Sequence, residues 1–256
     1  MRYHHLRNAT ALLTIGGRTL LIDPWLSDRG AGPSFGGTDQ RSPIVDLPLL
    51  IASIIDQANG VLLTHVHEDH FDARAKADLP RSMPILCTVP LVGELSLLGF
   101  TSIVAVDPGS DWEGITITPV MAQHGPPHVL YRMGHVVGYV LSAKNEPTVY
   151  LAADTILTDT VRAVISSHRP DVIIVNAGGA FSRGKDGPII MDAAQVAETL
   201  ALAPSATVIA VHLEATDHGR VTRSSLRDYI EAADASASRR LLIPADGEAV
   251  SLRRTS

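Results

Sequence analysis

The 256-residue sequence has a single cysteine, Cys87, and no long uninterrupted apolar run. One cysteine excludes an intramolecular disulfide and suits a reducing compartment. Residues 1–6 lack the apolar stretch that a signal peptide or a membrane span requires. We therefore expect a cytoplasmic protein that does not associate with membranes. Cys87 has apolar and β-branched neighbours, which predict a buried strand residue and not a reactive thiol.

An excess of positive charge is also lacking. The chain has 21 Lys and Arg against 27 Asp and Glu, and its net charge is −6 at pH 7. Proteins that bind nucleic acid hold the phosphate backbone with clustered Lys and Arg. Basic residues here are thinly scattered, and the pairs at 239–240 and 253–254 are typical of a solvated surface. The sequence therefore argues against nucleic acid as a substrate or partner.

Linkers and low-complexity tracts are missing too. No Ser/Gly-rich segment or block of like charge interrupts the chain, and 45% of its residues are hydrophobic, enough for a substantial core. Large α/β proteins can reach this length as one unit. We expect a single domain over residues 1–256.

Histidine and carboxylate residues are concentrated at one place. Residues 64–70, Thr-His-Val-His-Glu-Asp-His, follow an apolar, strand-like segment. Imidazole and carboxylate groups are ligands for zinc, manganese or iron, and they are costly to bury unless a cation compensates their desolvation. His65 and His67 have the alternate spacing of a strand end, whereas Asp69 and His70 follow as the chain turns and can face a second centre. The alternative is a solvated loop, but this density of ligands favours a metal site.

This segment resembles the His-x-His-x-Asp-His signature of the metallo-β-lactamase superfamily. The further ligands of that family have counterparts in the same order, each after an apolar, β-rich segment: Asp23, His124, Asp154 and His212. Singly each is weak, because an Asp after a strand is usually a turn former and a lone His is usually structural. Together they support one another, and the resemblance covers residues 1–252.

Short stretches point to one branch of the superfamily. The stretches at 21–24, 153–155, 176–179 and 211–214 look closest to the branch of the bacterial L-ascorbate-6-phosphate lactonase and related hydrolases. The residues after His212 depart from the lactonase pattern. A lactonase-like hydrolase is therefore expected, with a substrate that need not be the lactonase's own.

Apolar periodicity predicts two series of strands with helices between them. Strands are expected at residues 10–15, 19–23, 61–63, 84–88, 102–106, 115–121, 136–142, 147–151, 171–176, 206–211, 240–243 and 248–252. Helices are expected at 48–57, 90–98, 157–168, 192–202 and 223–235, with Asp192 and Thr222 as N-caps. Periodicity alone gives a mixed α/β (α+β) domain. The resemblance implies a four-layer αββα sandwich of two mixed β-sheets, with the ligands gathered at one edge.

The resemblance also implies a two-ion site with these ligands: His65, His67 and His124 for the first ion, Asp69, His70 and His212 for the second, and Asp154 as the bridge. Asp23 is then an outer residue that orients a ligand imidazole through its free N–H. The ions are zinc or manganese, with iron also suited to these ligands. Such a pair shares a water and holds it as hydroxide for attack, which makes Asp69, Asp154 and His212 the candidate catalytic residues.

Residues that contact the substrate are less well defined by the sequence. His218 is either a substrate contact and proton donor or a plain loop histidine. Arg183, Lys185 and Arg223 are candidates to hold one anionic group, with a solvated surface as the alternative. The Gly- and Pro-rich segment 26–48 follows Asp23 and is either a lid beside the metals or a disordered surface loop.

Three functions are compared. A dinuclear hydrolase of a small, anionic ester, lactone or phosphoester is favoured by the complete ligand set. An iron oxidoreductase of the same fold would pass electrons to a flavin domain, and no flavodoxin-like sequence follows residue 252. A non-catalytic sensor module would be expected to have lost ligands. The sequence leaves open the substrate, the physiological metal and whether the protein is a homo-oligomer.

Overall fold

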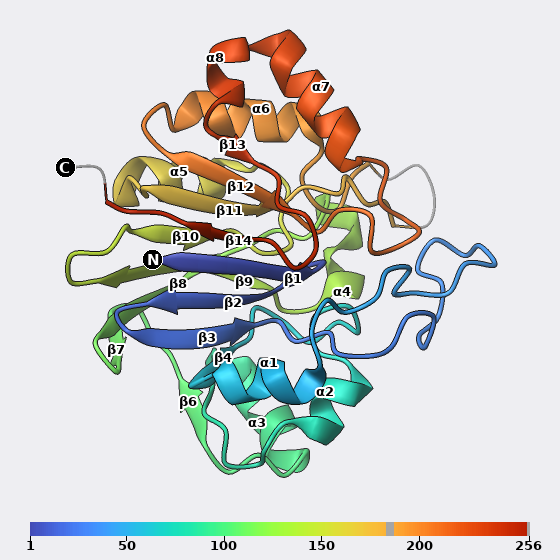
Figure 1. The fold of residues 1–256 in the computed structure, drawn as a ribbon, viewed down its shortest axis with the longest axis vertical. Helices are drawn as coiled ribbons and strands as arrows, with labels where there is room; N and C mark the ends of the chain where they lie inside the picture. Colours follow the sequence, from blue (N-terminus) through green and yellow to red (C-terminus); the bar gives the residue numbers. More distant parts are fainter. Residues whose placement is uncertain (183–186, 255–256) are drawn as a thin grey trace.

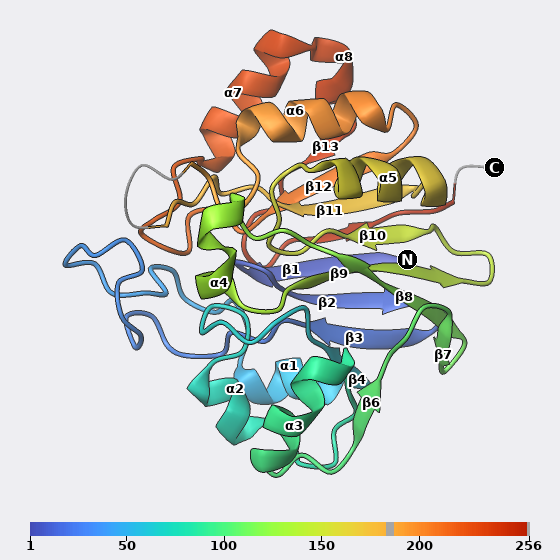
Figure 2. The same cartoon turned by 180° about the vertical axis from the view of Figure 1, so that it is seen from behind.

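The computed structural model of the chain describes residues 1–182 and 187–254. Within these residues the strands form two seven-stranded sheets that face each other, and helices lie on both outer sides (Figures 1 and 2). Both sheets contain parallel and antiparallel pairs. This is the αββα sandwich of two mixed sheets that the resemblance implies.

The first sheet has the strand order β14-β1-β2-β3-β4-β5-β6. Its strands are β1 (Arg2–Arg7), β2 (Thr10–Ile15), β3 (Arg18–Ile22), β4 (Gly60–Leu62), β5 (Ile85–Cys87), β6 (Ile103–Ala105) and β14 (Ala249–Ser251). β3 to β6 run parallel to one another, whereas β1 is antiparallel to both of its neighbours. Cys87 is buried at the end of β5, as its apolar neighbours predict.

The second sheet has the order β13-β12-β11-β10-β9-β8-β7. Its strands are β7 (Ser110–Trp112), β8 (Ile115–Met121), β9 (Val137–Ala143), β10 (Val149–Leu151), β11 (Val172–Asn176), β12 (Thr207–Val211) and β13 (Leu241–Leu242). β10 to β13 are parallel, and β9 reverses the direction between β10 and β8. β8 therefore points the same way as β10.

Helices cover both outer faces. On the first sheet lie α1 (Ile51–Gln57), α2 (Ala73–Asp78) and α3 (Val89–Leu97), and on the second lie α5 (Asp159–His168), α6 (Ala193–Leu202), α7 (Arg223–Ala233) and α8 (Ala235–Ser238). A 3-10 turn, η1 (Pro127–Val129), and α4 (Leu130–Met133) connect β8 to β9. Asp192 and Thr222 accept hydrogen bonds from the N–H groups of Gln195 and Ser225, so both predicted N-caps are confirmed.

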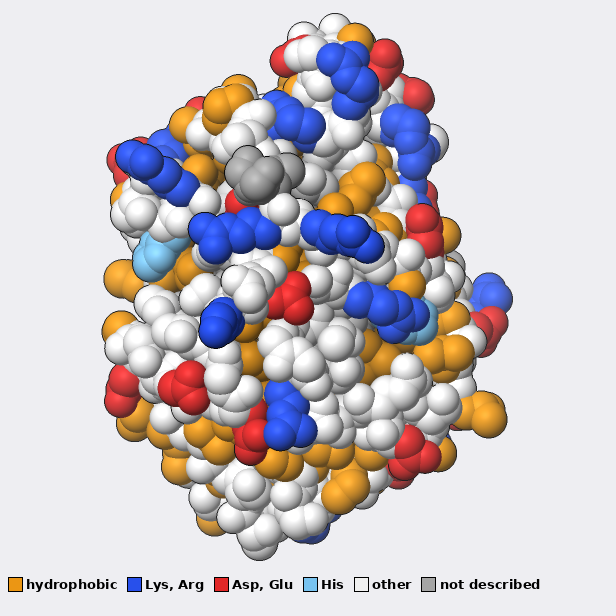
Figure 3. Space-filling view, turned by 60° about the vertical axis from the view of Figure 1, so that its left-hand side comes forward, with side chains coloured by type: hydrophobic (Ala, Val, Ile, Leu, Met, Phe, Trp, Pro, Cys, Tyr) orange, Lys and Arg blue, Asp and Glu red, His pale blue; other side chains and the backbone are white. Residues whose placement is uncertain are grey.

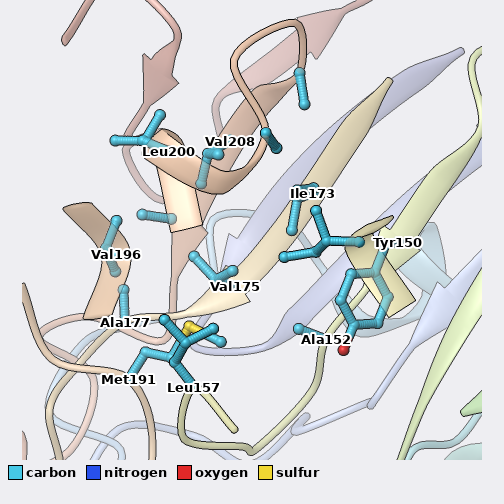
Figure 4. Packing of buried hydrophobic residues seen from close by; sticks show 14 of the residues in the cluster. Tyr150, Ala152, Leu157, Ile173, Val175, Ala177, Met191, Val196, Leu200 and Val208 are labelled. Carbon is cyan, nitrogen blue, oxygen red and sulfur yellow. The ribbon is translucent and has the colours of Figure 1, made fainter. Parts of the chain in front are cut away.

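Strands in both sheets are apolar on two faces because each sheet is covered on both sides. In β12, Val208 and Ala210 pack against the helices, whereas Ile209 and Val211 pack against the opposite sheet. Figure 4 shows the helix side of this packing, with Val196 and other α6 side chains near those of β11. Each fully buried Val, Ile or Leu side chain contributes roughly 1.5–3 kcal/mol of transfer free energy. This explains the continuous apolar runs in the sequence.

Several elements differ from the predicted ranges. β1, β7, α2 and α4 lie outside them, and the helix predicted at 48–57 begins only at Ile51 because Leu50 is extended. β1 has a polar sequence, Arg-Tyr-His-His-Leu-Arg, but His5 and Arg7 are buried among partners supplied by distant segments. In the described parts of the chain no helix combines the length and apolar character needed to cross a membrane.

Candidate metal centre

The strand directions bring the candidate ligands to one edge of the sandwich. Asp23 follows β3, and the 64–70 motif follows the parallel neighbour β4. Asp154 and His212 follow β10 and β12, which share one direction in the second sheet. His124 follows β8, which points the same way as β10. In open α/β sheets, ligands bind outside the carboxyl ends of the strands, and these side chains converge there.

The chain turns abruptly at three of these strand ends. Asp23, Ala153 and His212 have positive φ angles of 40°, 61° and 60°. This left-handed conformation is costly for a residue with a Cβ, on the order of 1 kcal/mol, and persists where neighbouring contacts enforce it. The His212 N–H, for instance, donates to the Asn8 carbonyl at 2.9 Å. Such outliers cluster at functional sites.

One group of potential ligand atoms combines three imidazoles with a carboxylate. His65, His67, His124 and Asp154 each offer an atom, and these atoms lie within 4.8 Å of one another. The His65 Nε2 and His67 Nδ1 atoms are 3.1 Å apart. Asp154 Oδ2 lies 3.3 Å from His124 Nε2 and 3.8 Å from His65 Nε2. This is the group expected around the first ion.

A second group contains Asp69, His70 and His212. Asp69 Oδ2 is 3.1 Å from His212 Nε2 and 3.8 Å from His70 Nε2. Asp154 reaches this group as well, with Oδ2 at 3.4 Å from His70 Nε2 and Oδ1 at 3.8 Å from His212 Nε2. The Asp154 carboxylate therefore stands between the two groups, where a bridging ligand is expected.

Asp23 lies behind the ligand imidazoles and orients them. Its carboxylate accepts hydrogen bonds from the Thr64 N–H at 2.8 Å, the Thr64 hydroxyl at 2.6 Å and His70 Nδ1 at 2.9 Å. Because the Thr64 hydroxyl donates to Asp23, it accepts from His65 Nδ1 at 2.9 Å. Both rings then carry their proton on Nδ1 and turn the Nε2 lone pair inward. Asp23, His65 and His70 also lie close enough together to form a ligand set. Both Asp23 oxygens already accept hydrogen bonds, however, which favours a role in orienting the imidazoles over a role as a metal ligand.

The same proton arrangement recurs at His124. Its Nδ1 donates to the Ile189 carbonyl at 2.8 Å, and its Nε2 faces Asp154. The buried His70 Nε2 makes no hydrogen bond within the described residues. Several inward lone pairs beside two carboxylates are costly to bury unless a cation lies among them. The donor set therefore fits divalent metal ions.

The charges of the site lead to the same conclusion. Burial and the neighbouring His70 lower the pKa of His65 well below 6.5, so this imidazole is neutral. Burial would raise the pKa of Asp69 and Asp154, but His70 and the other imidazoles lower both, and the carboxylates stay ionised. Burial also opposes a charge on His70, yet Asp154 and Asp69 raise its pKa well above 6.5. The ionised carboxylates therefore favour a positive charge among the imidazoles, which a divalent cation would supply.

Two asparagines with no role predicted from the sequence donate hydrogen bonds to the candidate aspartate ligands. Asn176 Nδ2 donates to Asp154 Oδ1 at 2.6 Å, and Asn8 Nδ2 donates to the Asp69 carbonyl at 3.1 Å. Asn176 ends β11 at the same edge as the candidate ligands. Its position at a strand end is therefore a sequence signal that could have placed it at the site. Asn8 lies in the turn between β1 and β2, and nothing local links it to Asp69.

A cleft of about 450 Å³ opens onto the candidate ligands. It is lined by His67, Glu68, Asp69, His124, Asp154 and His212, by Arg132, Ser182 and His218, and by the apolar side chains of Phe35, Met133, Ala180, Phe181, Ile189 and Ile190. Segment 26–48 borders the cleft through Phe35, whose position the sequence did not predict.

Arg223, one of the three residues expected to hold an anion, does not line this cleft. Arg223 begins α7, and its guanidinium donates to the carboxylates of Glu214 and Asp246 and to the Pro244 carbonyl. These acceptors are in the loops next to α7, so the charge is compensated away from the cleft. Arg183 and Lys185 lie outside the described residues.

Comparisons with known proteins agree with this geometry. A family model described as the beta-lactamase superfamily domain matches residues 18–213. The UPF0173 protein YddR of Bacillus subtilis (strain 168) is 33% identical over 253 residues, which cover 97% of this chain and 98% of that protein. The crystal structure of a possible metal-dependent hydrolase from Veillonella parvula DSM 2008 superposes with a TM-score of 0.93 at 33% identity, over 98% of this chain and 99% of that one. An isothiocyanate hydrolase from Delia radicum gut bacteria has a TM-score of 0.93 and 30% identity, over 99% and 100% of the two chains.

Proposed function

Because this chain belongs to the metallo-β-lactamase superfamily, and within it to the UPF0173 family, we propose that it is a metal-dependent hydrolase with a two-ion site. The observation that carries the proposal is the position of Asp154 between two groups of buried imidazole and carboxylate ligands. The ligands are assigned as follows: His65, His67 and His124 to one ion, Asp69, His70 and His212 to the other, and Asp154 to both.

When bound, two divalent ions of zinc or manganese, with iron also suitable, would lower the pKa of a shared water to about 7 and supply it as the nucleophile. The residues of the chain keep this arrangement in place. Asp23 and Thr64 fix the ring orientation of His70 and His65, and Asn176 fixes the Asp154 carboxylate. His218 lines the cleft, and burial lowers its pKa, so it is neutral and can hydrogen-bond a polar atom of the substrate.

The cleft volume suits a small substrate, and we propose an ester, a lactone or a phosphoester, including the phosphorylated lactone that the lactonase resemblance suggests. A second candidate is an isothiocyanate. The isothiocyanate hydrolase covers the whole chain, and Phe35, Met133, Phe181 and Ile189 give the cleft an apolar wall. Addition of water to the electrophilic carbon of R–N=C=S, followed by C–N cleavage, gives R–NH₂ and carbonyl sulfide.

The proposal includes an anionic group on the substrate. Among the described residues, Arg132 contributes the one basic side chain, of Lys or Arg type, that lines the cleft. On the face drawn in Figure 3, basic side chains stand apart with uncharged and acidic surface between them, and the net charge is −6. The negative net charge favours a small molecule over nucleic acid.

We also propose that residues 1–256 act as one domain. A cytoplasmic location stays a prediction.

The test is metal analysis combined with a substrate screen. After loading with zinc or manganese and removal of excess metal, we expect close to two ions per chain by mass spectrometry. Asp154→Ala should retain one ion or fewer and lose most activity, because both groups lose a ligand. Asp171→Asn is the control, since Asp171 binds the Thr148 N–H away from the site. The screen contains 4-nitrophenyl acetate, a homoserine lactone, bis(4-nitrophenyl) phosphate and benzyl isothiocyanate. One ion per chain that Asp154→Ala does not change would exclude the two-ion site.

A further inference from the structure

We propose that Asp217 is a positioning residue that fixes Phe35 as a wall of the cleft, and that this wall selects substrates with an apolar, ring-sized substituent. The inference rests on the proposed function only in taking the cleft as the substrate site. Neither residue belongs to the candidate ligands.

Asp217 binds the tip of segment 26–48 with both carboxylate oxygens. Oδ1 accepts the N–H groups of Phe35 and Gly36, each at 2.9 Å. Oδ2 accepts the hydroxyls of Ser34 and of Thr38, the latter at 2.6 Å. A carboxylate offers about four lone-pair sites, and these contacts engage them fully. We call residues 34–38 the Asp217-bound tip.

This carboxylate is ionised and closely wrapped. Burial raises the pKa of Asp217, but hydrogen bonds from the hydroxyls of Ser34 and Thr38 lower it by more. The net pKa is below the usual range for aspartate. A Cβ placed on Gly36 would lie 3.0 Å from the Asp217 carbonyl and Oδ2 atoms, so a side chain at that position would crowd the contact. The contact is thus specific to this short stretch of backbone.

The tip places the Phe35 ring between two other rings. The Phe35 ring centroid is 5.5 Å from that of His218 and 6.2 Å from that of Trp25, which is buried. Phe35 lines the cleft together with Phe181 and Met133. A substituent on the reacting group would therefore meet an apolar wall made partly by the tip. An apolar contact of this kind discriminates between substrates by roughly 10- to 200-fold.

The two ends of segment 26–48, which we call its stem, are held by other contacts than the tip. Arg7, fully buried, donates to the carbonyls of Trp25 at 2.6 Å, Ser27 at 2.9 Å and Val45 at 3.2 Å. The Ile44 N–H also donates to the Ala215 carbonyl at 2.9 Å. Because these bonds fix both ends of the segment, loss of Asp217 should release the tip without unfolding the stem or moving the candidate ligands.

Asp217 also links the two sheets at the cleft. It lies in the turn that begins at His212 after β12, whereas the tip belongs to the segment that begins at Asp23 after β3. The carboxylate thus sets the tip relative to His212 and His218, on the other side of the sandwich.

The experiment compares Asp217→Ala, Asp217→Asn and Phe35→Ala with the wild type as zinc-loaded full-length proteins. Asp39→Ala is the control, because Asp39 is an exposed aspartate of the same segment. Limited trypsin digestion reports the order of the tip, which lies between Arg29 and Arg41. Saturation-transfer NMR with benzyl alcohol reports the apolar wall, and kcat and KM for benzyl and methyl isothiocyanate report selection.

We expect Asp217→Ala to be cut in this segment about 10-fold faster and Phe35→Ala at the wild-type rate, since its backbone N–H still binds Asp217. Both variants should lose the benzyl alcohol signal and about 10-fold in kcat/KM for the benzyl substrate, mainly through KM, with the methyl substrate changed less than about twofold. Asp217→Asn should be intermediate.

Unchanged cleavage and unchanged benzyl alcohol binding in Asp217→Ala would overturn the proposal, as would equal losses for the benzyl and methyl substrates. If the variants behave as expected in digestion and binding while the wild type hydrolyses neither isothiocyanate, the isothiocyanate candidate fails and the positioning role of Asp217 stands.

Discussion

Single buried hydrogen bonds decide which nitrogen of His65, His70 and His124 faces the candidate centre. The Thr64 hydroxyl is the clearest case, because it donates to Asp23 and accepts from His65 in one place. All three residues are buried, so a lost partner cannot be replaced by water without rearrangement. We therefore expect a residue outside the candidate ligand set to contribute to metal affinity.

Replacing Thr64 with Val should therefore weaken metal binding by about 10- to 100-fold. The change keeps the shape of the side chain but removes the hydroxyl between Asp23 and His65. Unfolding free energy should fall by about 1–3 kcal/mol, the cost of buried groups left unpaired. Chelator competition and urea unfolding are the measurements. Thr64→Ser, which restores the hydroxyl, should recover most of both values, and wild-type metal affinity in Thr64→Val would contradict this role.

His212 and His218 can be separated by their metal content. His212→Ala should release one ion selectively and reduce turnover by orders of magnitude, because His212 Nε2 faces Asp69 and Asp154. His218→Ala should retain both ions and change mainly KM or substrate preference, because His218 lines the cleft beside Phe35. Titration with zinc followed by mass spectrometry distinguishes the two. Two tightly bound ions in His212→Ala would remove it from the ligand set.

At the scale of elements, Arg223, the first residue of α7, connects this helix to the segment before β14. The Arg223 guanidinium binds Glu214 in the turn after β12 and Asp246 before β14. Its side chain is 18% exposed, so the charge is largely shielded from water. α7 also covers α6 on the outer side of the second sheet. The pairings thus connect the helix to segments from both sheets.

Arg223→Met should accordingly reduce stability and leave catalysis intact. We expect the unfolding free energy to fall by about 2 kcal/mol, since Glu214 and Asp246 would keep half-buried charges without their cation. The KM for an anionic substrate should stay within about twofold. Arg227→Met, an exposed position on the same helix, is the control for a lost charge. A large rise in KM without loss of stability would instead support a role for Arg223 in binding the substrate.

At the scale of the whole molecule, the sandwich buries the charged groups of the candidate metal centre at one edge. The ligands lie at the carboxyl ends of strands from both sheets, and the cleft that reaches them holds about 450 Å³. The net charge of −6 does not favour a polyanion, and on the one face drawn in Figure 3 the basic side chains stand apart. The molecule as a whole therefore suits a small substrate.

Hydrolysis should accordingly depend little on ionic strength. Between about 50 and 200 mM salt, a nucleic-acid substrate bound through many phosphates would lose several orders of magnitude in affinity. We expect kcat/KM for the best small substrate to change less than about threefold over this range. Initial rates in a sodium chloride series provide the measurement. Cleavage of RNA or DNA that salt abolishes, without activity on any small substrate, would refute the proposal.

The sequence by itself determined what its local patterns encode. Apolar periodicity located most strands and helices, because strands covered on both faces are apolar throughout and surface helices repeat at 3.6 residues. The 64–70 motif indicated the metal chemistry, because ligand type and spacing are local properties. The order of the other strand-end ligands, read with the family resemblance, predicted which residues gather at one edge.

Only the tertiary structure decided which partner each polar side chain meets. Arg223 has the chemistry of an anion-binding residue, but Asp246 comes next to it only after folding. Phe35 and Asp217 are 182 residues apart in sequence, and neither reveals the other. β1 is polar in sequence yet buried, because its partners come from segments remote along the chain. A sequence states which groups are present, whereas their neighbours, and therefore their charge and role, are set by contacts between distant segments.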